Sequence, residues 1–389
     1  MKLIFLTSRF PYPLEKGDKL RSYFFIRELS KHHEVILISL CEKYPSDDDI
    51  SELARIATRV HVFKISFLSR FVNTFLAFFT CRPLQAGYFF NPCIKRKIHK
   101  IIQAELPDHI FCQLLRTALY VKGIPVDKTI DYQDVLSQGV KRRMEINKFP
   151  FSLVLQLEYK RLKKFESRIF NWFNHRIIIT ETDRDLMPVI DKKQIHVISN
   201  GVDIDYFDYQ FGAGKEKQCD VLFTGNMGYP PNVDCAHFIA EKVLPLLKQH
   251  RPNIRVVFAG ASPHSSLLKL RNENITVTGW VDEMREMYAT SRVFLAPMQI
   301  GTGLQNKLLE AMAMKLPCVT SNLANSALGG TNEKNILVAD EPGKICEYIL
   351  KLLDDKQFAE QISENGYEYV KSRFSWSGQI ENLNKIWGK

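Results

Sequence analysis

Short apolar runs alternate with helical stretches along most of this chain, and this alternation constrains the fold more than any other feature. In the second half we expect strands at 220–224, 254–259, 275–278, 293–296 and 318–320, with a helix at 235–250. Residues 204–217, which lack periodicity, are expected to be an interdomain linker. The first half repeats the pattern, beginning with a strand at 2–7 and a helix at 20–31. Strands and helices that alternate at this spacing predict an α/β fold, with parallel sheets covered by helices on both faces.

Length and composition indicate a globular protein of two domains. A chain of 389 residues is too long for a single core. The eight cysteines are scattered without CxxC spacing, which argues against a metal site and a disulfide framework and predicts a reduced, cytoplasmic protein. The first strand is too short for a signal-peptide core, and the longest apolar stretch, 67–80, is too short to span a bilayer. No transmembrane segment is expected.

Positive charge is concentrated in the first half of the chain. Residues 1–190 hold 31 Lys and Arg against 20 Asp and Glu, whereas residues 191–389 hold 22 against 23. Such asymmetry points to an anionic partner, which is a membrane surface, a polyanionic substrate or a nucleic acid. The basic half has no recognised nucleic-acid-binding motif, so we expect no nucleic acid partner.

Residues 66–103 interrupt the alternation with a stretch rich in phenylalanine and basic residues. An amphipathic region of this kind can lie at a membrane interface. The alternative is a buried core helix followed by a solvated basic face. We favour the membrane interpretation because the charge excess lies in this half, and we expect a protein peripheral to the inner face of the cytoplasmic membrane.

A glycine loop followed by a helix comes directly after the strand 293–296. Gly301 and Gly303 allow backbone N–H groups to approach a ligand closely, and the helix start behind them favours an anion. Asn306, Lys307 and Glu310 can share one face of that helix. This arrangement suits a nucleotide, with phosphates at the loop and ribose hydroxyls on the carboxylate. The alternative is an ordinary βαβ unit in which Glu310 is a solvated or capping charge.

Two further loops follow strands of the first half. Gly17 lies between the first strand and its helix, where it is either a phosphate-approach glycine or a plain turn glycine. Asp131 and Asp134 follow the strand 126–130, so either carboxylate can act as a general base or hold an acceptor hydroxyl. For Asp134, helix N-capping is the alternative.

Several motifs together resemble bacterial glycosyltransferases of family 4, which are retaining enzymes of the GT-B type. The motifs recur in the family's order as Asn200-Gly201-Val202-Asp203, Thr224-Gly225, Gly279-Trp280-Val281, Ala296-Pro297 and 307–313. A narrower set is similar to the sugar transferases of exopolysaccharide or lipopolysaccharide clusters. That set comprises Pro11-Tyr12-Pro13, 16–19, 231–234 and Gln305-Asn306-Lys307.

The resemblance implies two doubly wound Rossmann-like domains that face each other across a cleft. Residues 1–195 would form the acceptor domain and residues 196–373 the nucleotide-sugar donor domain, with a C-terminal helix at 374–389 packing back on the first. The implied activity is hexosyl transfer, with retention, from a nucleotide diphosphate sugar to a saccharide or lipid-linked acceptor in cell-surface polysaccharide biosynthesis. A non-catalytic nucleotide-sugar-binding or scaffold protein with the same fold is the alternative.

The resemblance also assigns site residues. Glu310 matches the second acid of the family's pair, which holds the donor ribose, and Thr302 stands eight positions earlier, where the family has the first acid. Gly17 matches the glycine that approaches the diphosphate, while Trp280 and Val281 match the turn that contacts the base. The other substrate-binding candidates are Asp18, Gly225, Asn226, Gly301, Thr302, Gly303, Leu304, Gln305 and Asn306.

Catalysis is assigned to Asp131, Asp134 and Lys307. Residues 226–233 contain no basic residue, so Lys307 and the amides of 301–304 would carry the diphosphate. No Asp-x-Asp follows a strand of the second half. We therefore expect no cofactor and metal-independent chemistry.

Overall fold

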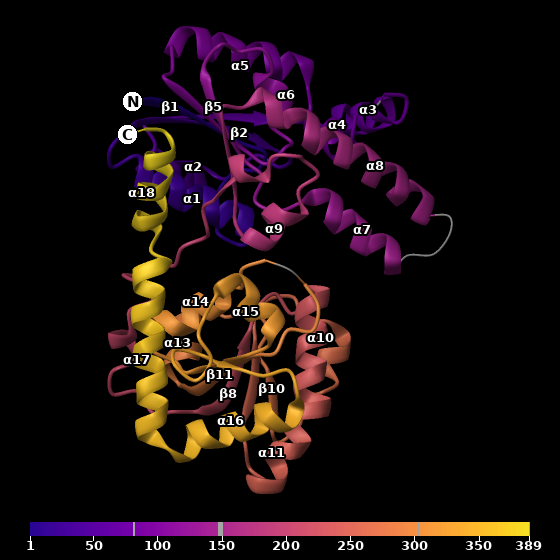
Figure 1. Cartoon of the computed structure of the whole chain (residues 1–389). Coiled ribbons are helices and arrows are strands. Elements are labelled where there is room, and N and C mark those ends of the chain that lie inside the picture. Colours follow the sequence, from indigo (N-terminus) through magenta and orange to yellow (C-terminus); the bar gives the residue numbers. More distant parts are fainter. Residues whose placement is uncertain (81, 147–150, 302, 389) are drawn as a thin grey trace. The chain divides into compact units, whose positions relative to one another are not determined.

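The chain folds into two compact units, seen in the computed structural model of Figure 1. The structure describes residues 1–80, 82–146, 151–301 and 303–388. The first unit comprises Met1–Ser199 and Ile380–Lys389, and the second comprises Asn200–Gln379. Each unit contains one parallel β-sheet flanked by helices, which confirms the predicted α/β class with two Rossmann-like domains.

The sheet of the first unit has seven parallel strands in the order β3-β2-β1-β4-β5-β6-β7. They are β1 (Lys2–Thr7), β2 (Glu34–Cys41), β3 (Arg59–Lys64), β4 (His109–Gln113), β5 (Asp127–Asp131), β6 (His175–Ile178) and β7 (His196–Val197). The central strands are buried along most of their length, as expected for parallel strands covered on both faces. The order reverses between β1 and β4, and open α/β sheets bind ligands at the carboxyl ends of the strands at such a point.

Helices of the first unit occupy the connections between these strands. They are α1 (Gly17–Leu29), α2 (Asp47–Ala54), α3 (Phe67–Phe78), α4 (Leu84–Phe89), α5 (Pro92–Glu105), α6 (Ala118–Val121), α7 (Leu136–Ile146), α8 (Phe151–Ile169) and α9 (Glu181–Leu186). Helix α1 begins three residues before the predicted start, because Lys16 is still extended and the helix follows directly. Helix α3, α4 and α8 lie side by side at one end of this unit (Figure 1).

The C-terminal residues of the chain return to the first unit. Trp387, just beyond α18 (Trp376–Ile386), donates a hydrogen bond from Nε1 to Thr129 Oγ1 at 2.8 Å. Its ring also lies 4.6 Å from the imidazole of His109. An aromatic ring that is both packed and hydrogen-bonded fixes a chain terminus firmly.

The second unit has six parallel strands in the order β10-β9-β8-β11-β12-β13. They are β8 (Cys219–Thr224), β9 (Val256–Ala259), β10 (Ile275–Val277), β11 (Ser291–Ala296), β12 (Cys318–Thr320) and β13 (Leu337–Val338). The five predicted strands are all present. Strand β13 was not predicted, because two residues are too few to produce a period in the sequence.

Helices cover both faces of the second sheet. They are α10 (Pro230–Phe238), α11 (Leu244–His250), α12 (Ser265–Leu268), α13 (Met284–Ala289), α14 (Asn306–Ala313), α15 (Asn322–Leu328), α16 (Pro342–Asp354) and α17 (Lys356–Arg373). The single helix expected at 235–250 begins earlier, at Pro230, since proline is well suited to a first helical turn. A π-helical stretch at Ile239–Val243 separates α10 from α11, just before Pro245, which has no N–H to donate.

Residues 204–217, expected to be an interdomain linker, instead belong to the second unit. Phe207 and Phe211 pack against its core, and Lys215 pairs with Glu286 at 2.5 Å. The segment lacks periodicity because isolated aromatic side chains, rather than a helix or strand, fix it. Across the described residues, no helix is both long and apolar enough to cross a membrane.

Candidate active site

The second unit presents its candidate site at the carboxyl edge of the sheet. The strand order reverses between β8 and β11, so the loops that follow these two strands border the same crevice position. Residues 225–229 follow β8, and residues 297–305 lead from β11 into α14.

Glycines allow the backbones at this edge to approach closely. Gly225 and Gly260 both have positive φ, at 152° and 143°. A Cβ added to Gly260 would lie 1.8 Å from the carbonyl oxygen of Gly225, so any side chain there is excluded. A Cβ on Gly225 would lie 3.1 Å from Lys307 Nζ, which shows that the predicted glycine and the predicted cation are neighbours.

Lys307 lies half-buried beside Gly225, on the first turn of α14. Its Nζ donates to Asn232 Oδ1 at 2.6 Å and lies 4.4 Å from the centroid of the Phe223 ring. Asn232 Nδ2 in turn donates to the carbonyl of Asn226 at 2.9 Å. Burial lowers the pKa of Lys307 to about 8, so the ammonium is still largely protonated near pH 7, and a neighbouring anion would stabilise its charge.

Glu310 lies one helical turn beyond Lys307 and is held by a tyrosine. Its Oε2 accepts a hydrogen bond from Tyr288 Oη at 2.7 Å, and that hydroxyl lies 2.9 Å from Thr224 Oγ1. Burial raises the pKa of Glu310, while the Tyr288 hydrogen bond and the charge of Lys307 oppose this shift. The ammonium of Lys307 and the carboxylate of Glu310 are thus held on one helix face by Asn232 and Tyr288. Neither Asn232 nor Tyr288 was among the predicted site residues.

The glycine loop before α14 has the backbone that its sequence requires. Gly301 and Gly303 have φ of 105° and 96°, in the region that favours glycine. The predicted candidate Thr302 lies outside the described residues. Gln305 is the N-cap of α14 and makes no side-chain capping hydrogen bond, so the helix start remains available to an anion.

Asn306 and Leu304 complete this face. Asn306 Oδ1 accepts from Asn200 Nδ2 at 3.1 Å, which ties the Asn-Gly-Val-Asp motif to the start of α14. Leu304 packs partly against the core. Trp280 and Val281 lie in the turn after β10, at the same edge of the sheet. The indole of Trp280 is exposed, with Nε1 donating to Asp282 Oδ1 at 2.8 Å, whereas Val281 packs on the core.

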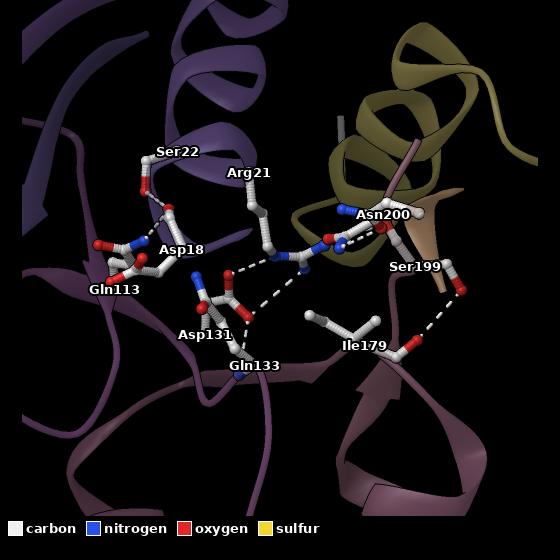
Figure 2. A network of polar contacts seen from close by, with 10 residues as sticks. Asp18, Arg21, Ser22, Gln113, Asp131, Gln133, Ile179, Ser199 and Asn200 are labelled. Atoms are coloured by element: carbon white, nitrogen blue, oxygen red, sulfur yellow. Dashed lines mark hydrogen bonds and ion pairs between the residues drawn. The ribbon is translucent and has the colours of Figure 1, made fainter. Parts of the chain in front are cut away.

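In the first unit, Gly17 opens α1 at the carboxyl edge of the sheet. A Cβ placed there would meet no atom within 4 Å, so the space beside it is open. The Asp18 carboxylate is held by Arg9 Nη1 at 2.7 Å. The backbone carbonyl of Asp18 accepts hydrogen bonds from Gln113 and Ser22 (Figure 2).

Asp131 is buried in an ion pair, as Figure 2 shows. Arg21 Nε donates to Asp131 Oδ2 at 2.7 Å, and each side chain is 1% exposed. The same guanidinium reaches the carbonyl of Ser199 at 3.0 Å, and Asp131 Oδ1 accepts from the amide of Gln133 at 3.2 Å. Asp131 is thus placed to link β5 to α1. By contrast, Asp134 is exposed to solvent three residues later.

Arg116 was missed by sequence reasoning. It follows β4, and among the described residues its buried Nε and Nη1 have no hydrogen-bond partner. Its Nη2 donates to Gln85 Oε1 at 3.2 Å, and its guanidinium lies 4.9 Å from the ring centroid of Phe89. Burial, and then the nearby charge of Arg9, lower its pKa. Buried donors without partners are rare and suit a ligand.

A metal site was not expected from the sequence. Within residues 1–80, 82–146, 151–301 and 303–388, no group of three or more His, Cys, Asp and Glu side chains is arranged to hold a metal ion.

Comparison with known proteins gives these sites a context. Residues 218–355, which contain β8, α14 and the loops between them, match the family described as "Glycosyl transferases group 1". An "Uncharacterized 44.6 kDa protein in cps region" of Klebsiella pneumoniae is 20% identical over 96% of each chain. The "Capsular polysaccharide biosynthesis glycosyltransferase CapM" of Staphylococcus aureus is 27% identical over 31% of this chain and 32% of its own.

The fold has close structural counterparts. The crystal structure of Anabaena Alr3699/HepE in complex with UDP and glucose superposes with a TM-score of 0.70, at 14% identity, over 100% of this chain and 99% of that one. Likeness at this identity shows the GT-B fold alone. Together with the family match, it supports a GT-B glycosyltransferase.

Proposed function

We propose that this protein is a retaining, metal-independent hexosyltransferase that uses a nucleotide diphosphate sugar. The observation that carries the proposal is the pairing of Lys307–Asn232 and Glu310–Tyr288 on one face of α14, beside the Gly225 loop. A cation next to glycine amides suits a diphosphate, and a carboxylate one turn away suits the ribose hydroxyls. The exposed Trp280 and the neighbouring Val281 would contact the base.

Catalysis in this proposal rests on stabilising the leaving group. The diphosphate gains negative charge as the glycosidic bond to it breaks. Lys307, the start of α14 and the amides near Gly303 and Leu304 would meet that charge without reorganisation, because Asn232 already fixes Lys307. Binding of the diphosphate would raise the pKa of Lys307 above its value of about 8 in the free protein, since an adjacent anion favours the charged form of a lysine.

The acceptor would bind to the first unit. Arg116 offers unpaired donors at the carboxyl edge of its sheet, and Asp134 offers an exposed carboxylate at the same edge. Asp134 is therefore our candidate for orienting an acceptor hydroxyl, while Asp131 would position the strand through Arg21. A lipid-linked saccharide on the cytoplasmic side of a membrane fits these groups, because a phosphate or sugar hydroxyl accepts from a guanidinium.

We further propose a role in cell-surface polysaccharide synthesis, which the names of the relatives support. CapM is named for capsular polysaccharide biosynthesis, the Klebsiella relative is named for a cps region, and HepE was solved with UDP and glucose. We extend the nucleotide-sugar donor and the polysaccharide product to this chain as part of the proposal.

A donor screen followed by a lysine substitution tests the proposal. A nucleotide sugar at a hundred times its Kd stabilises the folded protein by about 2.7 kcal/mol, which a thermal shift detects. With the donor identified, Lys307→Met should lower kcat for sugar transfer or donor hydrolysis by about 10²–10³-fold, the size of losing one electrostatic contact to a developing anion.

The exposed lysine Lys356 on α17 offers a matched control, because Lys356→Met removes the same charge far from the glycine loop. Equal activity of Lys307→Met and Lys356→Met would overturn the assignment of Lys307. Binding of nucleotide sugars without turnover of any donor would instead favour the non-catalytic binding or scaffold protein.

A further inference from the structure

Helix α3 exposes its apolar face and turns its polar face toward the protein, which is the reverse of an ordinary surface helix. Its outer face carries two stripes of large apolar side chains, each repeating every four residues. The first is Phe67, Phe71, Phe75 and Phe79, with exposed fractions of 76%, 64%, 57% and 75%, and the second is Leu68, Val72 and Leu76. Residues four apart lie on the same face of a helix, so the stripes form one continuous apolar ridge.

Polar side chains of α3 face the protein instead. Arg70 Nη1 donates to Tyr88 Oη at 2.6 Å and to Glu42 Oε2 at 2.7 Å. Ser69 Oγ accepts from Asn91 Nδ2 at 2.8 Å. These contacts fix the rotation of the helix, so the ridge is held outward by hydrogen bonds and an ion pair.

Small residues hold α3 close to its neighbour. A Cβ added to Gly87 of α4 would lie 2.7 Å from Ala77 Cβ, so the two helices touch where neither has a bulky side chain. Arg161 of α8 donates to the carbonyls of Ala77 and Phe78, each at 2.7 Å. Helix α3, which carries the ridge, is therefore packed against α4 and tied at its C-terminal end to α8 (Figure 1).

Helix α8 exposes further apolar side chains and adds positive charge. Its first turns expose Phe151, Leu153 and Leu157. Further along the same helix, Lys160, Lys163, Lys164 and Arg168 are exposed. Residues 66–104 contain six basic residues and no Asp or Glu. The apolar surface thus lies in a stretch of chain that carries net positive charge.

We propose that the ridge of α3, with the first turns of α8, docks on an anionic lipid bilayer by inserting into the interface. An amphipathic helix with phenylalanine and leucine on one face and basic residues nearby is the kind that lies in such an interface. The charges favour anionic headgroups. This docking surface belongs to the first unit and shares no residue with the donor site of the second, so the inference goes beyond the proposed transfer reaction.

The composition of the ridge favours lipid over a protein partner. Protein interfaces of ordinary size carry about one hydrogen bond per 100–200 Å², and the residues that dominate their binding energy are chiefly Trp, Tyr and Arg. The seven side chains of the two stripes are phenylalanine, leucine and valine, which have no side-chain hydrogen-bonding groups. The hydrocarbon of a lipid bilayer has no hydrogen-bonding groups either, so it matches this surface.

Vesicle flotation with the full chain tests the docking. At low salt the protein should float with vesicles of phosphatidylglycerol and phosphatidylcholine in equal parts, and less with phosphatidylcholine alone. Phe71→Gln with Phe75→Gln should lower the partition coefficient by about tenfold or more, because two phenyl groups no longer leave water. Lys163→Glu with Lys164→Glu should weaken binding to the anionic vesicles only.

Ile190 provides the matched control, because it is an exposed apolar residue of the same unit outside the ridge, and Ile190→Gln should bind like the original protein. An unchanged thermal unfolding midpoint and unchanged nucleotide thermal shift show that the phenylalanine variant is folded and that its donor site is separate. Wild-type protein that stays unbound at low salt, or equal flotation of the phenylalanine variant, would overturn the proposal. So would concentration-dependent dimers that the same variant makes monomeric.

Discussion

The two sheet edges that carry the candidate site residues are built in opposite ways. In the second unit, Lys307 and Glu310 lie on one turn of α14, and each already has a hydrogen-bond partner. In the first unit, Asp131 is closed off by Arg21, while Arg116 keeps two buried donors without partners among the described residues. The edge of the second unit, which we call the donor edge after its proposed ligand, is organised before any ligand binds. The edge of the first unit, which we call the acceptor edge, retains unmet hydrogen-bonding capacity.

The difference has an energetic meaning. Preorganised charge costs no rearrangement when a leaving group develops its own charge, which suits the donor side. A buried hydrogen-bond donor without a partner costs about 1–3 kcal/mol of stability in the free protein. A protein can retain that cost at a site where a bound ligand supplies the missing partner. We infer that the donor edge is shaped for chemistry and the acceptor edge for recognition.

The largest expected effect concerns Asp131. Asp131→Asn leaves the guanidinium of Arg21 buried without its countercharge, and breaking a buried ion pair costs about 3–5 kcal/mol. Urea unfolding should show this loss of stability, whereas the activity per folded molecule should be unchanged. Asp127→Asn, at the exposed amino end of the same strand, should change stability little. Full stability with lost turnover would instead make Asp131 a catalytic residue.

Glu310 tests the donor edge with a smaller change. Glu310→Gln keeps the shape of the side chain but removes the charge that accepts from Tyr288 and, in our proposal, from the ribose. A hydrogen bond to a charged group is worth about 1.5–3 kcal/mol, so the Kd of the nucleotide diphosphate should rise about tenfold to a hundredfold. Calorimetric titration measures it.

The exposed Glu360→Gln on α17 should leave that Kd unchanged. Tyr288→Phe should raise it less than Glu310→Gln does, because the carboxylate would keep its charge. A Tyr288→Phe effect as large as that of Glu310→Gln would show that the hydroxyl, rather than the carboxylate, carries the binding.

The donor edge could be predicted from the sequence because its parts are local. Gly301, Gly303, Lys307 and Glu310 fall within ten residues, and a glycine loop between a strand and a helix has a definite physical consequence. The alternation of strands and helices likewise predicted both sheets. Asn232 and Tyr288 were not assigned, because a side chain that supports another from a distant helix leaves no pattern in sequence.

The acceptor edge could not be assembled in the same way. Arg9 and Asp18 lie between β1 and the first turn of α1, Arg116 follows β4 and Asp134 follows β5. Only the folded sheet brings these three segments to one edge. Position after a strand suggested Asp131 and Asp134 equally, since both fall at a carboxyl end. The ion pair with Arg21 that distinguishes them joins residues far apart in the chain.

The protonation of Lys307 gives a pH test. Its pKa in the folded protein is about 8, below its ordinary value of 10.5, so the free protein loses this charge as pH rises through about 8. Nucleotide diphosphate affinity should be flat near pH 7 and then fall by up to about tenfold per pH unit. The free energy of unfolding should instead rise with pH above about 8, because the unfolded chain still binds the proton that the folded protein has lost.

Lys307→Arg is the matched control for this profile, because a guanidinium stays charged across this range. Its affinity should not fall between pH 8 and pH 10. At the acid end, the raised pKa of Glu310 predicts weaker binding as that carboxylate becomes protonated. A wild-type profile identical to that of Lys307→Arg would remove Lys307 from diphosphate binding.

The smallest expected effect has the most informative sign. Arg116→Met removes a buried guanidinium with two unpaired donors, at the cost of its bond to Gln85 and its packing on Phe89. We expect the free energy of unfolding to rise by about 1 kcal/mol, since the desolvation of unpaired donors exceeds one ordinary hydrogen bond. Arg176→Met should do the reverse, because that guanidinium donates to the carbonyls of Phe170, Phe173 and Asn174. If both variants lose stability alike, Arg116 is a structural residue, and the contrast between an organised donor edge and an unsatisfied acceptor edge fails at the residue that defines it.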